Sequence, residues 1–162
     1  MRLELKWLSL LVYYLYLVLD LQLLLNILEV KMSEIGKKIW IFPDAFLPAK
    51  GRPYKTSKNE DQFGHESLCM LNSSDTDALL NISVYYEDRE PLENYEHTLK
   101  AKRSLHLRLD NITLLNNQKL LREVPYSIIL KSNIKIVAQL SRLDTTSDYN
   151  SFMTSLGWGE NV

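Results

Sequence analysis

The stretch His65–Pro91, HESLCMLNSSDTDALLNISVYYEDREP, decides how the rest of the chain is interpreted. It contains two apolar segments, a polar turn between them, and a charged turn that ends in a proline. In the second segment, Ala78–Glu87, Ile82 and Val84 would share one face of a strand because side chains alternate along it. Asn, Ser and Asp favour turns because they hydrogen-bond to nearby backbone. The stretch therefore predicts two adjacent strands, Glu66–Leu71 and Ala78–Glu87.

Further strands are predicted on both sides of this stretch. In Lys102–Leu109 the residues alternate so that three leucines face inward, and β-rich segments occur at Tyr126–Leu130 and Ile134–Leu140. Shorter segments of this kind are Lys38–Phe42 and Tyr95–Leu99. Strands spaced by roughly 8–12 residues, with turn residues between them, are typical of an antiparallel sandwich. The predicted fold class is all-β: a single-domain antiparallel β-sandwich.

Three regions are predicted along the chain. Residues 1–31 form a hydrophobic leader, residues 32–146 form the sandwich domain, and residues 147–162 form a C-terminal tail. Helix is expected only in the leader and over Asn150–Leu156, and the tail is otherwise expected to be loose. The 162 residues are enough for one domain with its own core.

The leader is unusual because Trp7–Leu19 is almost entirely apolar, and only Asp20, Gln22 and Asn26 interrupt the apolar sequence that continues after it. We expect that translation begins at Met32, which would make the leader upstream sequence. Alternatively, it is a membrane anchor or a secretory signal. A spanning helix needs about 20 mostly apolar residues, and a signal needs an Ala-x-Ala-like cleavage site, which is not seen here. A third alternative is a helix that is buried or binds a partner.

Composition and charge argue against several classes of function. The net charge of −1 and the pI near 6.3 do not suit a dedicated nucleic-acid binder, whose affinity depends on many Lys and Arg contacts to phosphates. The sequence has no Gly-rich phosphate loop and no nucleophile elbow. Its three histidines lack the spacing of metal ligands. We therefore predict a non-enzymatic protein with no cofactor and no metal.

The first candidate site residues are His65 and Glu66, at the start of a predicted strand. One interpretation is a hydrogen-bonded pair that lines a pocket and acts as acid and base. The other is that the ring of His65 only anchors the end of the strand.

A basic outward face is expected on one strand, and it comprises Lys100, Lys102, Arg103, His106 and Arg108. Such a face could bind nucleic-acid phosphates or an acidic protein surface. Alternatively, it is a solvated strand face whose charges discourage pairing with another edge.

Two tyrosines and an ion pair form the last candidate group. Arg142 and Asp144 are two residues apart, so they share one face of a strand and are predicted to pair, because Arg binds carboxylates in a bidentate manner. Exposed Tyr85 and Tyr86 beside them would suit a binding surface or a carbohydrate platform. They could equally lie in a subunit interface.

Several short motifs occur in a characteristic order between Ile35 and Thr146. They are Trp40, His65-Glu66, Leu71–Ala78, Tyr85-Tyr86 with Asp88 and Glu90-Pro91, Arg103–Arg108, Ser132-Asn133, Gln139 and Arg142-Leu143-Asp144. In this order and spacing they resemble the sensory rhodopsin transducer family. The chain departs from the family pattern in the turn after Trp40, which reads IFPDAFLPAKG, and at Lys135, where the family usually has proline.

The resemblance implies a small cytoplasmic β-sandwich that assembles as a homotetramer. The founding member couples to a seven-helix retinal photoreceptor and has been proposed to touch DNA. We therefore expect a signalling adaptor that binds a membrane photoreceptor or another signalling protein. The alternatives are a binder of a small carbohydrate or nucleotide, and a DNA-binding regulator, which the net charge disfavours. The predicted partner- or ligand-binding residues are His65, Glu66, Tyr85, Tyr86, Arg103, His106, Arg108, Arg142 and Asp144.

Overall fold

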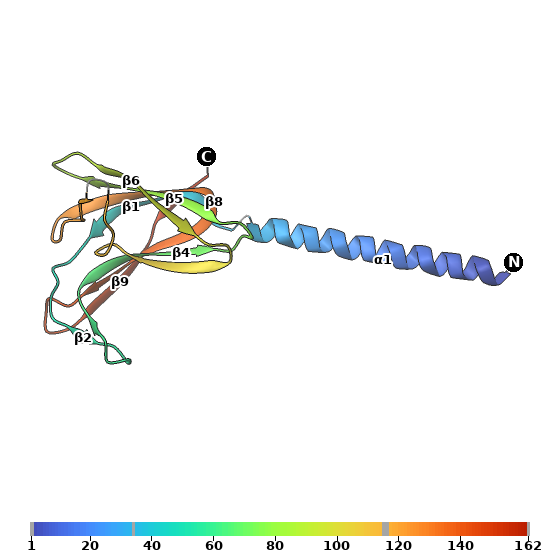
Figure 1. Ribbon diagram of the computed structural model, residues 1–162, viewed down its shortest axis with the longest axis horizontal. Helices are drawn as coiled ribbons and strands as arrows, with labels where there is room; N and C mark the ends of the chain where they lie inside the picture. The colour runs from blue at the N-terminus through green and yellow to red at the C-terminus, as the bar shows by residue number, and fades with distance from the viewer. Residues whose placement is uncertain (1, 34, 115–116, 162) are drawn as a thin grey trace. The chain divides into compact units, whose positions relative to one another are not determined.

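The longest strand, β8 (Pro125–Asp144), belongs to both layers of the fold. Its first half lies between β1 (Lys37–Phe46) and β5 (Ala78–Tyr86). Its second half lies between β4 (His65–Asn72) and β9 (Ser151–Leu156). Each half of β8 therefore forms the centre of one sheet in this computed structural model (Figure 1).

The remaining strands extend these two sheets. The first sheet gains β6 (Leu92–Leu99) beside β5 and β10 (Trp158–Glu160) beside β1, and the second gains β7 (Arg103–Arg108) beside β4. The segment after β1 contains a small separate hairpin of β2 (Tyr54–Lys55) and β3 (Asp61–Gln62). All of these pairings are antiparallel. The prediction of an antiparallel β-sandwich is confirmed.

The N-terminal helix α1 (Arg2–Ser33) and the sandwich are two separate compact units, with the division after residue 34. The helix expected in the leader is therefore present, and its side chains from 11 to 26 are all exposed. No helix in the described part of the chain has the length and hydropathy required to cross a lipid bilayer. The structure describes residues 2–33, 35–114 and 117–161, with side chains of α1 described only from 11 to 26.

The hydrophobic core lies between the two sheets because apolar residues alternate along their strands. β8 contributes to it along its whole length, since it faces the core in both sheets. Burial of large aliphatic side chains contributes roughly 1.5–3 kcal/mol for each one, so this core is the main source of stability. Its central members are Leu68, Met70, Leu80, Ile82, Val84, Ile128, Leu130, Ile136, Ala138 and Leu140.

Two residues at the start of β1 depend on the backbone of Ile136 in β8. The indole Nε1 of Trp40 donates a 3.0 Å hydrogen bond to the Ile136 carbonyl oxygen, which satisfies the one polar atom of a buried ring. Gly36 has a φ of 98°, and a Cβ atom there would lie 2.1 Å from the same oxygen. Only glycine fits this close approach of two backbone segments.

The tail was predicted incorrectly. Residues Asn150–Leu156 were expected to form a helix within a loose tail, but Ser151–Leu156 forms β9 and pairs with Gln139–Asp144. The segment is too short for a stable helix of its own, and the free edge of β8 supplies hydrogen-bonding partners for an extended chain. The sheets therefore continue into the region assigned to the tail.

The two predicted segments Tyr126–Leu130 and Ile134–Leu140 belong to one strand, because β8 continues through the three residues between them. The polar side chains at 131 and 133 are exposed where the strand passes from one sheet to the other. The Asn133 side-chain oxygen accepts a 2.8 Å hydrogen bond from the Leu79 backbone N–H. These residues therefore suit a strand that leaves one sheet, and not a turn.

Replacement of Leu140 tests the role of β8 in the core. Leu140 is fully buried, so L140A should lower the free energy of unfolding by about 2–5 kcal/mol, because it removes buried methyl groups and leaves a cavity. The matched control is L79A, at a leucine that is 60% exposed, which should change stability by about 0.5 kcal/mol or less. Chemical denaturation of both variants provides the measurement. Similar losses in the two would contradict the assignment of the core.

Candidate functional site

The start of β4 places two neighbouring residues in opposite environments. Side chains alternate along a strand, so Glu66 points into the sandwich and is fully buried, while the half-buried His65 points outward. The structure therefore does not contain a hydrogen-bonded pair of His65 and Glu66, which was one of the two interpretations of the sequence. Each residue instead belongs to a network of its own.

The buried carboxylate of Glu66 is held by three donors from two other strands. Its Oε1 accepts hydrogen bonds from the Phe46 backbone N–H and from Arg142 Nε, both at 3.0 Å, and its Oε2 accepts one from the Tyr126 hydroxyl at 2.6 Å. Arg142 Nη2 also lies 3.0 Å from Oε1, which is within ion-pair distance but outside hydrogen-bonding geometry. A buried charge needs such pairing to persist. Glu66 is therefore a structural link between β1, β4 and β8.

This network corrects the predicted pairing of Arg142 with Asp144. Arg142 pairs with Glu66, while Asp144 Oδ1 accepts hydrogen bonds from the backbone N–H and the hydroxyl of Thr146, at 2.8 Å and 2.6 Å. The guanidinium of Arg142 also lies 5.4 Å from the ring centre of Phe46, in cation–π range. A buried carboxylate on the neighbouring strand is a stronger partner for arginine than the half-buried one on the same strand.

Tyr126 stays protonated in this network. Burial raises the pKa of its hydroxyl above the usual value of 10.0, and the neighbouring Glu66 carboxylate raises this pKa further. The hydroxyl therefore acts as a donor to Glu66. With three donors in place, Glu66 is poorly suited to accept a proton from a substrate, so the acid–base interpretation of His65 and Glu66 loses its base.

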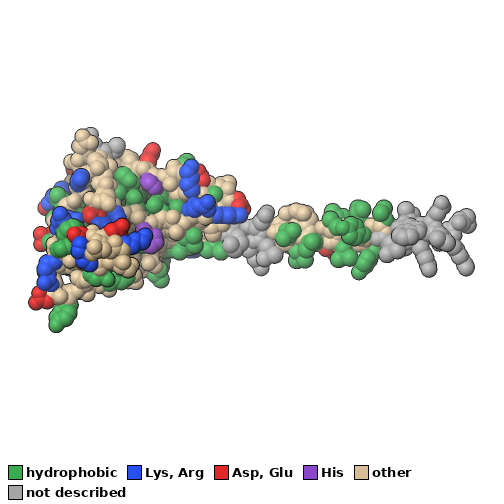
Figure 2. Space-filling model, turned by 60° about the horizontal axis from the view of Figure 1, so that its bottom comes forward, with side chains coloured by type: hydrophobic (Ala, Val, Ile, Leu, Met, Phe, Trp, Pro, Cys, Tyr) green, Lys and Arg blue, Asp and Glu red, His purple; other side chains and the backbone are tan. Residues whose placement is uncertain are grey.

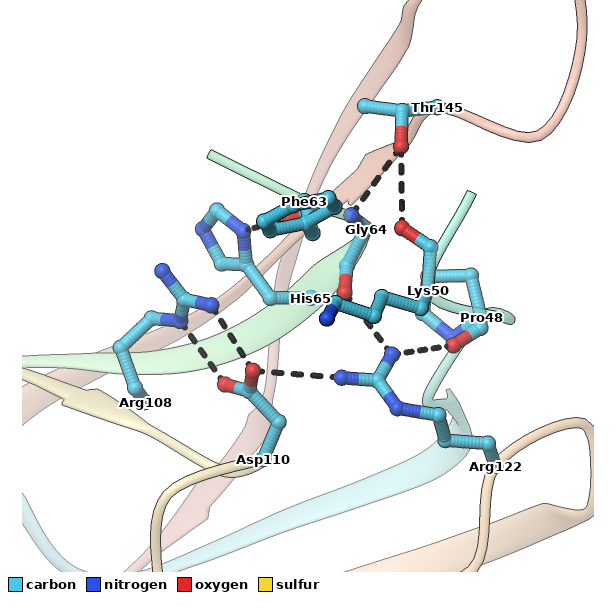
Figure 3. A network of polar contacts seen from close by, with 9 residues as sticks. All are labelled: Pro48, Lys50, Phe63, Gly64, His65, Arg108, Asp110, Arg122 and Thr145. Carbon is cyan, nitrogen blue, oxygen red and sulfur yellow. Dashed lines mark hydrogen bonds and ion pairs between the residues drawn. The ribbon is translucent and has the colours of Figure 1, made fainter. Parts of the chain in front are cut away.

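On the outer face, four residues form what we call the polar cluster: His65, Arg108, Asp110 and Arg122 (Figure 3). Asp110 accepts two 2.8 Å hydrogen bonds from Nε and Nη2 of Arg108, and a longer one of 3.2 Å from Arg122. Nδ1 of His65 donates to the Phe63 carbonyl oxygen at 2.7 Å. The cluster joins the start of β4 to the end of β7 and to the segment that precedes β8.

The charges of the polar cluster are interdependent. Burial alone would raise the pKa of Asp110, but the hydrogen bond from Arg108 and the positive charges of Arg108 and Arg122 hold it below the usual value. The pKa of His65 is lowered, chiefly by burial and further by the two arginines, against the raising effects of the Phe63 carbonyl and Asp110. Asp110 is therefore ionised and His65 is mostly neutral near pH 7.

Backbone contacts fix the surroundings of the polar cluster. Arg122 Nη1 donates to the carbonyl oxygens of Pro48 and Gly64, at 2.6 Å and 2.8 Å. The Thr145 hydroxyl accepts from Gly64 N at 3.1 Å and donates to the Lys50 carbonyl oxygen at 3.2 Å. These bonds connect the segment after β1, the start of β4 and the end of β8 (Figure 3).

The expected basic face is largely neutralised. Lys100 pairs with Asp77 at 2.8 Å, Lys102 pairs with Asp75, and Arg108 pairs with Asp110. Arg103 and His106 are exposed, but they are an odd number of residues apart on β7 and so lie on opposite faces. Figure 2 shows acidic and basic side chains interspersed over the visible face of the sandwich.

The two tyrosines do not form the predicted exposed platform. Tyr86 is buried, and its hydroxyl accepts a 3.1 Å hydrogen bond from the backbone N–H of Leu121. Tyr85 is half-buried, and its hydroxyl donates to Glu93 at 3.4 Å. The alternation of β5 separates the two rings, so only Tyr85 reaches the surface.

Sequence reasoning missed a set of exposed apolar side chains on β9 and β10, near the C-terminus, which we call the C-terminal apolar face. It includes Phe152, Leu156 and Trp158, whose exposed fractions are 70%, 77% and 68%. A groove of about 360 Å³ lies beside it and is lined by residues of β1, β9 and β10, among them Phe42 and Pro43. β9 contains no charged residue and no proline to protect its edge. Clustered exposed apolar side chains mark interaction surfaces.

The described residues contain no constellation with the geometry of a metal site, since no three His, Cys, Asp or Glu side chains among them converge.

The chain matches the family described as the Anabaena sensory rhodopsin transducer over residues 35–159. The chain belongs to this family. Its sandwich thus has the family's extent, which includes β9 and most of β10.

Two solved structures resemble this member of the transducer family. The crystal structure of Thermotoga maritima 1070 has 37% sequence identity and a TM-score of 0.64, and the match covers 78% of this chain and 97% of that one. The Anabaena sensory rhodopsin transducer has 30% identity and a TM-score of 0.56, with 68% and 90% covered. No curated protein sequence matches the chain.

Replacement of Glu66 tests the buried network. E66Q removes the negative charge and leaves Arg142 without its buried partner, so the free energy of unfolding should fall by about 3–5 kcal/mol. E87Q is the control, because Glu87 is exposed at the end of the next strand. Urea denaturation at neutral pH measures both. An E66Q variant as stable as E87Q would show that the network does not stabilise the fold.

Proposed function

We propose that this transducer-family protein is a non-enzymatic adaptor that assembles as a homotetramer and binds the cytoplasmic face of a rhodopsin-type membrane receptor. Membership of the family supports the receptor class, since one relative is named as a sensory rhodopsin transducer. The observation that carries the proposal is the C-terminal apolar face, which marks a protein contact. The buried network around Glu66 offers no free acid or base to a substrate.

A second copy of the chain is the occupant that we assign to the C-terminal apolar face. One edge of β9 pairs with β8. The backbone groups of its opposite edge are available to an extended strand from another chain. The sequence SFMTSL carries no charge, so antiparallel pairing with its own copy brings no like charges together. A two-fold symmetric contact of this kind is the commonest in homo-oligomers, and permanent interfaces are the more hydrophobic ones.

The geometry supports DNA binding, and carbohydrate or nucleotide binding at Arg142, less well. Three of the five basic residues expected to bind DNA are paired with aspartates, which leaves little charge to release counterions from phosphates. Arg142, expected near a carbohydrate or nucleotide pocket, is engaged by Glu66. A receptor would instead meet exposed charges on the rim of the assembly, such as Arg103.

The oligomeric role of the C-terminal apolar face predicts a change in mass. In the full chain, the double variant F152S/L156S should have a smaller mass than the wild type, because two large side chains leave the interface. Light scattering coupled to size-exclusion chromatography measures this mass, and the circular dichroism spectrum checks the fold. L79S is the control, since Leu79 is an exposed leucine on β5. An unchanged mass in the double variant would exclude β9 from the interface.

Receptor binding is tested with a rhodopsin-type receptor from the same source organism, held in lipid nanodiscs. We expect saturable binding of the full chain, and about tenfold weaker binding of R103E if this exposed charge meets the receptor at a desolvated contact. R89E is the control, because Arg89 is exposed in the turn after β5. Biolayer interferometry provides the affinities. An absence of binding by the wild-type chain would refute the adaptor function, whereas equal binding of both variants would refute only the placement at Arg103.

A further inference from the structure

One edge of the Arg108 guanidinium is left unused by the protein. Nε and Nη2 are both committed to Asp110 in a bidentate pair. Nη1 has no hydrogen-bond acceptor among the residues that the structure describes, and the side chain is 28% exposed. Because Asp110 is itself nearly buried and holds the planar fork in place, Nη1 is presented in a fixed direction.

His65 provides a second group beside this edge. Its Nδ1 is committed to the Phe63 carbonyl oxygen, so Nε2 is the nitrogen left for another partner. No protein atom in the described ranges bonds to Nε2. In Figure 3 the ring of His65 is drawn beside the free end of the Arg108 guanidinium, and the charge of Arg108 is one of the causes that lower the pKa of His65, so the two side chains interact. When His65 is protonated, Nε2–H and Nη1–H become two neighbouring donors.

The charge around these donors is positive and only partly compensated. Among the residues that the structure describes, Asp110 is the single carboxylate that contacts Arg108 and Arg122. Arg122 donates from Nη2 to Asp110 and from Nη1 to two backbone carbonyls. This arginine therefore cannot reach a ligand without breaking those bonds.

We propose that His65 Nε2 and Arg108 Nη1 form a binding site for the phosphate group of a small molecule. Phosphate suits the site because its oxygens accept from a guanidinium and an imidazolium at the same time. A nucleic acid suits it poorly, since its affinity depends on many phosphate contacts and this chain has a net charge of −1. The proposal does not depend on the adaptor function. If both hold, the bound phosphate compound would be a signal that the adaptor responds to.

Binding at this site is coupled to protonation of His65. In the free protein the pKa of His65 is lowered by burial and by Arg108 and Arg122, while the Phe63 carbonyl and Asp110 act in the opposite direction. A bound anion adds negative charge beside the ring and so raises this pKa. The pKa of His65 is therefore higher in the complex than in the free protein. By linkage, the anion binds more tightly as the pH falls through the range between these two pKa values.

The test is NMR titration of the three histidine rings in the full chain, with inorganic phosphate and sulfate as probes and chloride used to keep the ionic strength at about 0.15 M. Sulfate is included because it does not change its own charge over this pH range. We expect either anion to raise the pKa of His65 by about one unit at saturation, which corresponds to about tenfold tighter binding to the protonated form. His97 and His106 are internal controls. A shift of His65 no larger than theirs would overturn the proposal.

Variants separate this site from a general attraction of anions. R108Q should abolish saturable sulfate binding in calorimetry. R89Q should retain it, although Arg89 forms the same bidentate pair with its neighbour Asp88, at 2.7 Å and 2.9 Å. Equal losses in both variants would refute the site. If R108Q does not fold, the histidine titration of the wild-type chain decides. A DNA duplex that shifts His65 at about 0.15 M salt where phosphate and sulfate do not would also refute a small-molecule site.

Discussion

The continuity of β8 is the constraint on which the rest of the structure depends. One strand forms the centre of both sheets, so the registers of its neighbours are coupled through it. Because side chains alternate with a period of two, a slip of one residue would turn Ile128, Leu130 and Ile136 out of the core together. The Ile136 carbonyl, which accepts from Trp40 and leaves room only for Gly36, holds β1 against the middle of this strand.

The same alternation explains why interior and exterior chemistry lie side by side at the start of β4. Glu66 faces inward, where a charge persists only if it is paired, and the fold supplies three donors to it. His65 faces outward, where water can complete a partial network. His65, the proposed ligand-binding residue, therefore lies one residue away from the structural Glu66. For two adjacent residues in a strand, the sequence alone does not show which one faces the core and which one faces the solvent.

The sequence predicted the secondary structure correctly where the local pattern and the tertiary environment favour the same conformation. Ala78–Tyr86 is a strand whose start matches the prediction and whose end differs from it by one residue. Ser151–Leu156 has no such pattern, and its conformation is decided by the free edge of β8. Arg142 was paired with the nearest carboxylate along the chain, while its real partner is 76 residues away. Ion pairs between strands follow register, and register cannot be read from spacing.

The candidate site shows the same limit more sharply. His65 and Arg108 were both identified from the sequence, but as members of different groups. Asp110 follows Arg108 by two residues, a spacing that could have suggested the pair. Arg122 gave no signal, because its role is to bind the backbone carbonyls of Pro48 and Gly64, which only the folded chain brings near. In the proposed adaptor, the carboxylate of Glu66 is already engaged by three donors, so a ligand would act mainly through the surface. An anion at the polar cluster would change the charge of that surface, and such a change acts on partners within about a Debye length without any change of fold.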